Sequence, residues 1–308
     1  MNGPATYPGA AEEQHKALSR LIGPHVDFEI EKIDLLGSGT DSTAYLINDN
    51  LVFRIAHNDN AVRTLAKEMS VLPVLARDLP ARTPDLQYMA FEAHDLSFSG
   101  YEVLRGEPLT AGLFFGLERV VQDRILEELY EFLMALHAIP PGSVEALNEE
   151  KLTGAYNGKQ RRLHHELSAI LAPEEVREIE GIFESYERSN PDSARKSAVI
   201  HADLKPAHVL VDEVSGHLTG VIDWGDSCLG DPDFDFACIQ RFFGEKFFRR
   251  VLERTPPADQ RRIVHKVPFF ILIRALQDVL YDRAYEDERS VMLGLRALRE
   301  HLKSLLVR

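Results

Sequence analysis

Two kinds of hydrophobic periodicity divide the chain. Between residues 33 and 104 apolar residues occur in short runs typical of β-strands, whereas from residue 122 onward most segments show the three-to-four-residue spacing of amphipathic helices. The pattern predicts an α+β fold, with a β-rich N-terminal lobe over residues 1–105 and a mainly helical C-terminal lobe over residues 106–308. Residues 1–20 are expected to form a tail or a short helix.

The clearest element of the N-terminal lobe is a predicted β-hairpin. Its strands, 43–47 and 51–55, flank the turn-forming triplet 48–50, and pairing them sets Arg54 opposite Ala44. The other predicted elements of this lobe are a helix that begins at Asp59 or Asn60 and ends at Pro73, and a strand over 98–104.

The C-terminal lobe is predicted to be built from helices. The strongest signal is 122–139, where the apolar residues form one stripe, so this helix should lie in the core. Further helices are predicted at 159–171, 174–189, 238–253, 258–266, 268–286 and 288–306, with prolines between several of them.

The composition excludes several classes of function. With 308 residues, 44% hydrophobic content and 2 cysteines, we expect a large core, no disulfide framework and a cytoplasmic location. We find neither a secretory signal nor an apolar stretch long enough to span a membrane. The formal net charge of −14 argues against nucleic acid or an anionic membrane as a partner, and it would attract a cationic small molecule. No obligate protein partner is inferred.

The stretch from residue 201 to 226 is the most informative about chemistry. It reads as a strand, a tight turn and a returning strand. A register that sets Asp212 opposite Leu218 also sets His208 opposite Ile222. Residues 208 and 223 then lie at the same open end of this hairpin.

Three polar residues converge in this register: His208 and Asp223 at the end of the hairpin, and Asp203 in the loop before it. Carboxylates so close together repel one another unless a cation neutralises them, and oxygen ligands suit Mg²⁺. The spacing therefore predicts a site for Mg²⁺ and phosphate groups. Taken singly, each of the three residues would more simply be a solvated polar group at the end of a strand.

The same stretch resembles the catalytic segment of the aminoglycoside phosphotransferase family, small-molecule kinases built on the protein-kinase fold. The family pattern is His-x-Asp, then Asn or His five residues later, and after a strand Ile-Asp followed by Phe, Trp or Leu and by Gly. The match runs from His201 through Asp235. A histidine at position 208 resembles the branch that contains aminoglycoside 2''-phosphotransferases and macrolide 2'-phosphotransferases. The resemblance implies a bilobal, protein-kinase-like fold.

The resemblance also implies roles for these residues. Asp203 would orient the acceptor hydroxyl and accept its proton, and Asp223 would hold Mg²⁺. His208 would either ligate the metal or donate a hydrogen bond to phosphate, because imidazole prefers softer metals than Mg²⁺.

Residues that bind the nucleotide are expected in the N-terminal lobe. Small residues at 37–42 would let the backbone approach phosphates. By resemblance, Arg54 occupies the position of the kinase strand lysine, and an ion pair with Glu68 is expected because an unpaired carboxylate on the apolar face of a helix is costly. Backbone groups of Glu102 and Leu104 would contact the purine, with ATP and GTP both open. The full expected set is Ser38, Gly39, Thr40, Ser42, Arg54, Glu68, Glu102 and Leu104.

Residues that bind the acceptor are expected near the catalytic loop and on a late helix. Asp278, Asp282 and Glu286 follow one another at four-residue spacing. Like charges at this spacing repel, which indicates a compensating cation from the acceptor or from neighbouring arginines, unless the three side chains are simply exposed to solvent. Asp226 and Asp235 complete the set, although Asp235 is also suited to cap the backbone near the catalytic loop.

These observations predict an enzyme, an ATP- or GTP-dependent O-phosphotransferase that uses Mg²⁺. The expected acceptor is a hydroxyl of a small, cationic natural product, with an aminoglycoside-type antibiotic and resistance by inactivation as the first candidate. The alternatives are a macrolide or peptide-antibiotic kinase and a metabolic kinase for choline, homoserine or a sugar. A non-catalytic nucleotide-binding regulator is disfavoured because Asp203 and Asp223 are both intact. Protein kinase activity is disfavoured because no activation segment follows Asp226.

Overall fold

The computed structural model describes residues 8–39, 41–91, 97–144, 146–147, 166, 168–190, 197–284 and 288–306. The chain divides into two compact units. Unit 1 comprises Met1–Pro73 and Thr83–Leu104, and unit 2 comprises Val74–Arg82 and Arg105–Arg308.

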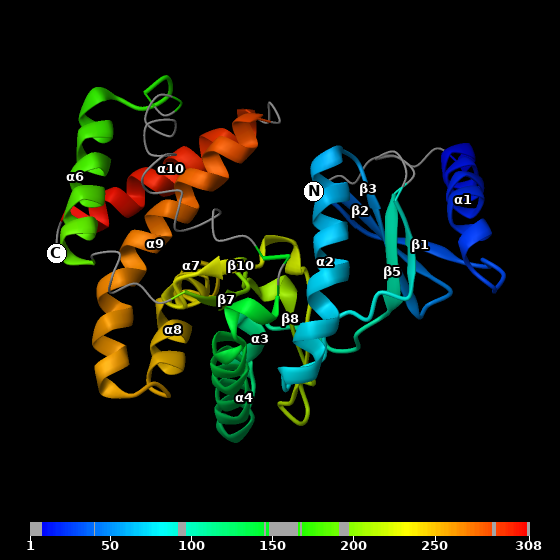
Figure 1. Ribbon diagram of the computed structural model, residues 1–308, viewed down its shortest axis with the longest axis horizontal. Helices are drawn as coiled ribbons and strands as arrows, with labels where there is room; N and C mark the ends of the chain where they lie inside the picture. Colours follow the sequence, from blue (N-terminus) through cyan, green and yellow to red (C-terminus); the bar gives the residue numbers. More distant parts are fainter. Residues whose placement is uncertain are drawn as a thin grey trace. The chain divides into compact units, whose positions relative to one another are not determined.

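Unit 1 contains an antiparallel five-stranded sheet with the order β1-β2-β3-β5-β4 (Figure 1). Its strands are β1 (Ile33–Ser38), β2 (Ser42–Ile47), β3 (Leu51–Ala56), β4 (Tyr88–Ala90) and β5 (Phe98–Glu102). The predicted hairpin is confirmed, since β2 and β3 pair with Ala44 opposite Arg54. Asn48 and Asp49 close it with positive φ angles, which Asn and Asp tolerate better than most residues.

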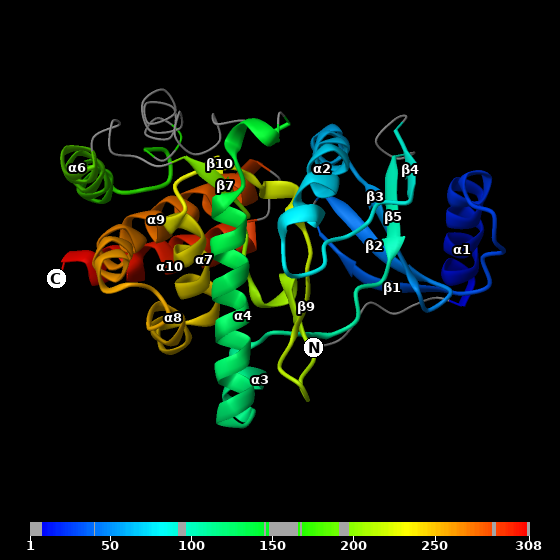
Figure 2. The same ribbon diagram turned by 60° about the horizontal axis from the view of Figure 1, so that its bottom comes forward.

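The two faces of this sheet are covered by different helices. Phe53 and Ile55 of β3 share a core cluster with residues of α1 (Pro8–Ile22), whereas Ala56 packs with Leu65 of α2 (Asp59–Asp78). Figure 2 shows α1 and α2 on opposite sides of the sheet. Because side chains alternate along a strand, Arg54 lies on the α2 side.

Helix α2 corrects one prediction, because it continues through Pro73 to Asp78. Proline lacks the N–H that would bond to the carbonyl one turn earlier, so it weakens a helix but does not always end it. The residues around it, Val71, Leu72 and Leu75, are buried. Their burial stabilises the helix across the proline. A rule that uses only the position of proline in the sequence does not take this packing into account.

Unit 2 is mainly helical, and the predicted fold class is confirmed. Its longer helices are α3 (Ala111–Gly116), α4 (Arg119–Ala138), α6 (Pro173–Ser189), α7 (Asp233–Phe243), α8 (Glu245–Leu252), α9 (Pro257–Ala284) and α10 (Glu288–Leu306). One small sheet has the order β6 (Glu107–Pro108), β8 (Val209–Val211), β9 (Leu218–Val221), and the other pairs β7 (Ala198–Ile200) with β10 (Cys228–Gly230). None of the described helices has the length and apolarity needed to cross a membrane.

Two predicted helix boundaries are wrong. The segment predicted as one helix over 238–253 is divided at Gly244, whose φ of +89° is accessible to glycine but costly for other residues. Conversely, the two helices predicted around Pro268 form the single helix α9. Val267 and Phe269 are buried there, so packing again holds a helix together across a proline. The helix predicted at 159–171 lies largely outside the described residues.

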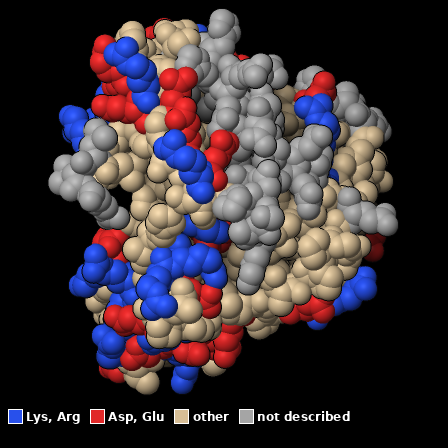
Figure 3. Space-filling view, turned by 60° about the vertical axis from the view of Figure 1, so that its left-hand side comes forward, with Lys and Arg blue, Asp and Glu red and all other residues tan. Residues whose placement is uncertain are grey.

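Acidic and basic side chains are interspersed on the described part of the face shown in Figure 3. The excess of acidic residues behind the net charge of −14 therefore forms no single acidic patch on the described part of that face. The charges that bear on function have to be found at the site itself.

Candidate active site

The hairpin of β8 and β9 has the predicted register at its open end. The backbone N–H of Ile222 donates a hydrogen bond to the carbonyl of His208, with 3.0 Å between nitrogen and oxygen. At the closed end the register shifts by one residue, and Asp212 bonds to His217 instead of facing Leu218. At this end the Asp212 carboxylate accepts hydrogen bonds from the backbone N–H groups of Val214 and Ser215, which tightens the turn.

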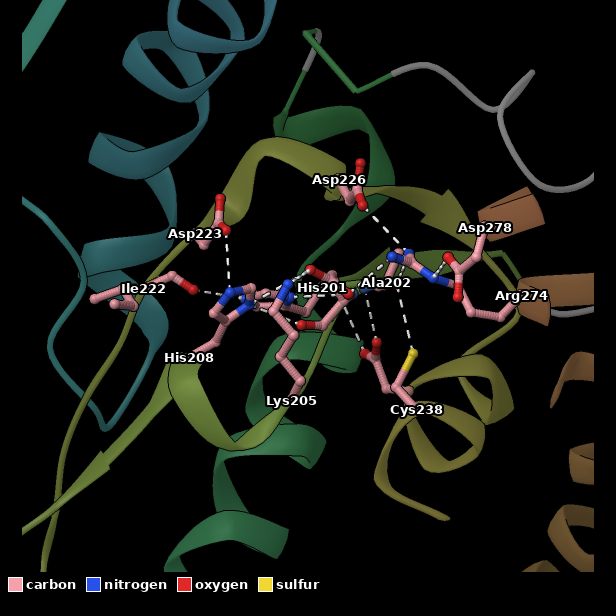
Figure 4. A network of polar contacts seen from close by, with 12 residues as sticks. His201, Ala202, Lys205, His208, Ile222, Asp223, Asp226, Cys238, Arg274 and Asp278 are labelled. Atoms are coloured by element: carbon pink, nitrogen blue, oxygen red, sulfur yellow. Dashed lines mark hydrogen bonds and ion pairs between the residues drawn. The ribbon is translucent and has the colours of Figure 1, made fainter. Parts of the chain in front are cut away.

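The structure brings Asp203, His208 and Asp223 together. Each offers a ligand atom, and these atoms all lie within 4.8 Å of one another. His208 Nε2 is 3.0 Å from Asp223 Oδ2, and Figure 4 shows the two side chains facing each other. Asp203 and His208 are buried, whereas the Asp223 side chain is 40% exposed.

The partners of His208 determine its tautomer. Nδ1 lies 2.9 Å from the backbone carbonyl oxygen of Asp203, and a carbonyl can only accept, so Nδ1 carries the hydrogen. In the neutral ring Nε2 then presents a lone pair to the carboxylate of Asp223. Two electron-rich atoms at 3.0 Å repel unless a proton or a metal cation lies between them.

The donor set fits a divalent metal ion. Two carboxylates and an imidazole nitrogen that faces them can hold a cation such as Mg²⁺, although the imidazole is the softest of the three ligands. The backbone of Asp223 has a φ of +63°, a conformation that is sparsely populated by residues other than glycine. Such strain recurs at functional sites.

The carboxylate of Asp203 has a cation beside each oxygen. Lys205 Nζ is hydrogen-bonded to Oδ2 at 2.9 Å, and Arg274 Nη2 of α9 lies 3.0 Å from Oδ1. The second contact lacks hydrogen-bond geometry, so Oδ1 accepts no hydrogen bond from any described residue. A buried carboxylate oxygen with an open acceptor position is what a general base for a hydroxyl requires.

Asp235 of α7 supports the loop that carries Asp203. It is fully buried, and its carboxylate accepts hydrogen bonds from the backbone N–H groups of His201 (3.2 Å) and Ala202 (2.9 Å). A third contact, at 2.9 Å, comes from Nε2 of His137 on α4. Ala202 has a φ of +64°, which is unfavourable for alanine, and these bonds hold it there. Asp235 therefore lies beneath the loop, without the exposed surface that the substrate contact expected from the sequence would need.

His201 links the loop to the hairpin. Its Nε2 donates to the carbonyl of Ile222 at 3.1 Å, and its Nδ1 accepts from the backbone N–H of Asp203 at 3.3 Å. Burial, reinforced by His208, lowers the pKa of His201. The ring is therefore neutral and fixed in one tautomer, and it connects the loop that carries Asp203 to the residue that follows β9.

The acidic line expected on α9 carries its own cations. Asp278 accepts hydrogen bonds from Arg274 Nε (3.0 Å) and Arg241 Nη2 (2.7 Å). Burial raises the pKa of Asp278, while the two arginines act in the opposite direction. Asp282 also has an interaction partner, and Glu286 lies outside the described residues. The charge of Asp278 is thus compensated within the protein.

In unit 1 the expected ion pair is present. Arg54 Nη1 donates to both carboxylate oxygens of Glu68, at 3.0 and 2.8 Å. Glu68 is 2% exposed, so this pair is shielded from solvent and fixes the direction of the guanidinium.

The remaining expected nucleotide residues lie around the same sheet. Between β1 and β2 the N–H of Gly39 donates to the carbonyl of Ser42 at 2.9 Å, and the hydroxyl of Ser38 is 2.8 Å from that of Thr43. Thr40 lies outside the described residues. Glu102 ends β5 and Leu104 follows two residues later.

Two cationic residues beside Asp203 were not among the residues expected at the site from the sequence. Lys205 lies two positions after Asp203, and this closeness in the sequence could have indicated that it contacts Asp203. Arg274 was expected only as one of the neighbouring arginines that could compensate the acidic line on its own helix. Its contact with Asp203 depends on how α9 packs beside the loop, which no local pattern encodes.

A five-stranded antiparallel sheet followed by a mainly helical unit is the architecture of kinase-like phosphotransferases. The Asp203, His208 and Asp223 cluster lies in unit 2, in the loop before β8 and at the open end of the β8–β9 hairpin. The Phosphotransferase enzyme family matches residues 32–265. The chain therefore belongs to that family, and it is a kinase.

Two known proteins are similar to the chain in sequence, and one of them is a phosphotransferase. The chain is 24% identical over 253 residues, 72% of its length and 74% of the relative's, to the uncharacterized protein YcbJ of Bacillus subtilis. It is 35% identical to the viomycin phosphotransferase of Streptomyces vinaceus over 105 residues, 33% of this chain and 36% of that enzyme.

Solved structures with similar folds include two kinds of antibiotic kinase. An aminoglycoside 2''-phosphotransferase IIIa, solved with GDP and kanamycin, has a TM-score of 0.82 at 25% identity, over 95% of this chain and 99% of that one. A macrolide 2'-phosphotransferase type I has a TM-score of 0.69 at 19% identity, over 95% and 98%. The resemblance inferred from the sequence is confirmed.

Proposed function

We propose that this phosphotransferase transfers the γ-phosphoryl group of ATP or GTP to a hydroxyl of a small natural product, with aminoglycoside-type antibiotics as the first class of acceptor. The observation that carries the proposal is Asp203, whose buried Oδ1 has an open acceptor position next to the cluster with His208 and Asp223. The aminoglycoside 2''-phosphotransferase with GDP and kanamycin supports both the nucleotide and the acceptor class.

The reaction requires one proton transfer and one exchange of bonds at phosphorus. The acceptor hydroxyl donates its proton to Asp203 Oδ1 while its oxygen bonds to the γ-phosphorus, and the bond from that phosphorus to the departing nucleoside diphosphate breaks. Lys205 is hydrogen-bonded to Oδ2, and Oδ1, which is paired with Arg274 but accepts no hydrogen bond from a described residue, takes the proton.

Asp223 and His208 would hold Mg²⁺, which when bound neutralises charge on the phosphate oxygens. Arg54, oriented by Glu68, would bind phosphate oxygens with its guanidinium group. Positioning and charge stabilisation account for most of the catalysis in such transfers.

A peptide-antibiotic kinase is the second candidate. The observation that favours it is the 35% identity to viomycin phosphotransferase, which covers 105 residues. Both candidates use the same phosphate-transferring residues, so only the acceptor distinguishes them.

The test is an acceptor screen with purified protein, Mg²⁺ and either ATP or GTP. The panel contains aminoglycosides, macrolides, peptide antibiotics, amino alcohols and sugars, and mass spectrometry identifies any phosphorylated product. Asp203→Asn should lower the turnover rate by about 10²–10⁴-fold, the usual contribution of a general base. Asp27→Asn, the same change at an exposed position of unit 1, is the control. Phosphoryl transfer at the wild-type rate by the Asp203 variant would refute the proposed role of this loop.

A further inference from the structure

The β8–β9 hairpin contains a β-bulge. The pairing along β9 passes from Gly220 directly to Leu218, so Thr219 between them has no counterpart on β8. The bulge lies between the turn of the hairpin and its open end, where His208 and Asp223 meet. It therefore determines which register reaches the open end.

The bulge also changes the direction of the backbone N–H groups along β9. In a regular strand alternate N–H groups point to the same edge, so Leu218 and Ile222, four residues apart, would both point toward β8. Ile222 does so and donates to the carbonyl of His208 at 3.0 Å. Leu218 instead donates to Oε2 of Glu128, on α4 outside the sheet, at 2.6 Å. The carboxylate of Glu128 is therefore an acceptor that only the bulged strand can use.

Glu128 holds this part of the strand with both oxygens. Oε1 lies 2.6 Å from Nδ1 of His217, the residue before Leu218. The Glu128 side chain is 27% exposed, and Figure 2 shows α4 beside β9. Both contacts lie on the side of the bulge that faces the turn.

The turn of the hairpin is held on α4 by other contacts. Arg124 donates to the carbonyl of Ser215. Gly216, with a φ of +76°, lies so near α4 that a Cβ at this position would be 2.9 Å from Val121 Cγ1. If the bulge were lost, the turn would keep its place and the register at the open end would slip by one residue. Such a slip turns each side chain to the other face of the strand, so Asp223 would face away from its partner.

We propose that Glu128 is a positioning residue for the metal site: by accepting the N–H of Leu218, it stabilises the bulge that turns Asp223 toward His208. The inference rests on the proposed function, in which these last two residues hold Mg²⁺ beside the phosphates. Glu128 acts through the strand and not as a ligand, because its carboxylate bonds on the other side of the bulge from Asp223.

Two substitutions separate the hydrogen bond of Glu128 from its charge. Glu128→Gln removes the charge but keeps the length and an acceptor oxygen for Leu218, so it should bind metal as the wild type does. Glu128→Asp keeps the charge but is one methylene shorter, so its carboxylate no longer reaches that N–H. A direct attraction between the charge of Glu128 and the metal would reverse this ranking.

The measurement is the metal affinity of the complex with a non-hydrolysable analogue of ATP or GTP. Mn²⁺ stands in for Mg²⁺, and electron paramagnetic resonance follows the free ion. In Glu128→Asp the affinity should fall about tenfold, the lower end of the usual loss when a supporting residue of a metal site is removed. Nucleotide affinity in EDTA should match the wild type, and hydrogen exchange at the Leu218 amide should become faster.

The control is Glu131→Asp, the same shortening at an exposed position of α4, which should leave all three quantities unchanged. Thermal unfolding verifies that each variant is folded. If Glu128→Asp does not fold, Glu128→Met, which is unbranched and has no carboxylate, takes its place with the same expected result.

The outcomes distinguish this inference from the proposed function. If the wild type phosphorylates no acceptor of the panel, the proposed function fails, whereas the metal affinities of the Glu128 variants can be compared without an acceptor. If Glu128→Asp keeps the wild-type metal affinity, or if Glu128→Gln loses it, only the role of Glu128 is wrong.

Discussion

Asp235 provides the sharpest test of how the catalytic loop is held. Its buried carboxylate accepts hydrogen bonds from the backbone of His201 and Ala202 and contacts His137, with distances of 3.2, 2.9 and 2.9 Å. Asp235→Asn keeps the size of the side chain but replaces one acceptor oxygen by a donor NH₂ group. That group can bond to His137 if the imidazole moves its proton to Nδ1.

The cost of the change follows from the backbone donors. One amide oxygen cannot replace both carboxylate oxygens, so one buried N–H of the loop is left without an acceptor, at about 1–3 kcal/mol. Ala202 has a φ of +64°, and the left-handed region costs an L-residue about 1–2 kcal/mol. With weaker bonds the loop tends to leave this conformation, so we expect phosphoryl transfer to fall more steeply than stability.

Urea unfolding followed by circular dichroism measures the loss of stability, and Asp27→Asn, an exposed residue, is the control. A second variant tests the strain directly. Because glycine adopts positive φ freely, Ala202→Gly in the Asp235→Asn background should recover part of the transfer rate. If Asp235→Asn keeps its unfolding free energy within about 0.5 kcal/mol of wild type and its full transfer rate, the reasoning is wrong.

Two further changes test other parts of the chain. Glu68→Gln removes the buried charge that compensates Arg54, so nucleotide affinity in calorimetric titration and unfolding free energy should both fall, the latter by about 3 kcal/mol; unchanged values would contradict a shielded pair. The Arg299 hydrogen bond lowers the pKa of Glu175, so its stabilisation is present above the unfolded value of 4.5 and lost as pH falls through the folded value. The Tm difference between wild type and Glu175→Gln should therefore shrink on acidification, with Glu174→Gln as control.

The sequence predicts those features of the fold that depend on near neighbours. The register of β2 and β3 follows from strand alternation and a turn triplet, and it places Arg54 correctly. His208 and Asp223 meet because a hairpin brings its own ends together. The register shift at Asp212 was not predictable in this way, since strand alternation does not include the side-chain hydrogen bonds of the turn.

Local sequence patterns do not predict features of the fold that depend on how distant parts of the chain pack together. Proline rules ended two helices too early, at Pro73 and Pro268, because they ignore the burial of neighbouring residues. The contact of Arg274 with Asp203 likewise requires α9 to lie beside the catalytic loop. The residue paired with Oδ1 of Asp203 was thus the least accessible to sequence reasoning.

The charge of the chain as a whole is a poor guide to the acceptor. The formal net charge is −14, and most of the carboxylates around Asp203 are compensated within the protein. The carboxylates there are Asp203, Asp223, Asp226 and Asp278. Asp203, Asp226 and Asp278 each contact at least one of the cations Lys205, Arg241 and Arg274, whereas Asp223 faces His208. A site of this kind discriminates between acceptors by their hydrogen-bonding pattern, because a mismatched buried donor or acceptor stays unpaired. The arrangement of these groups therefore carries more information about the acceptor than the charge total does.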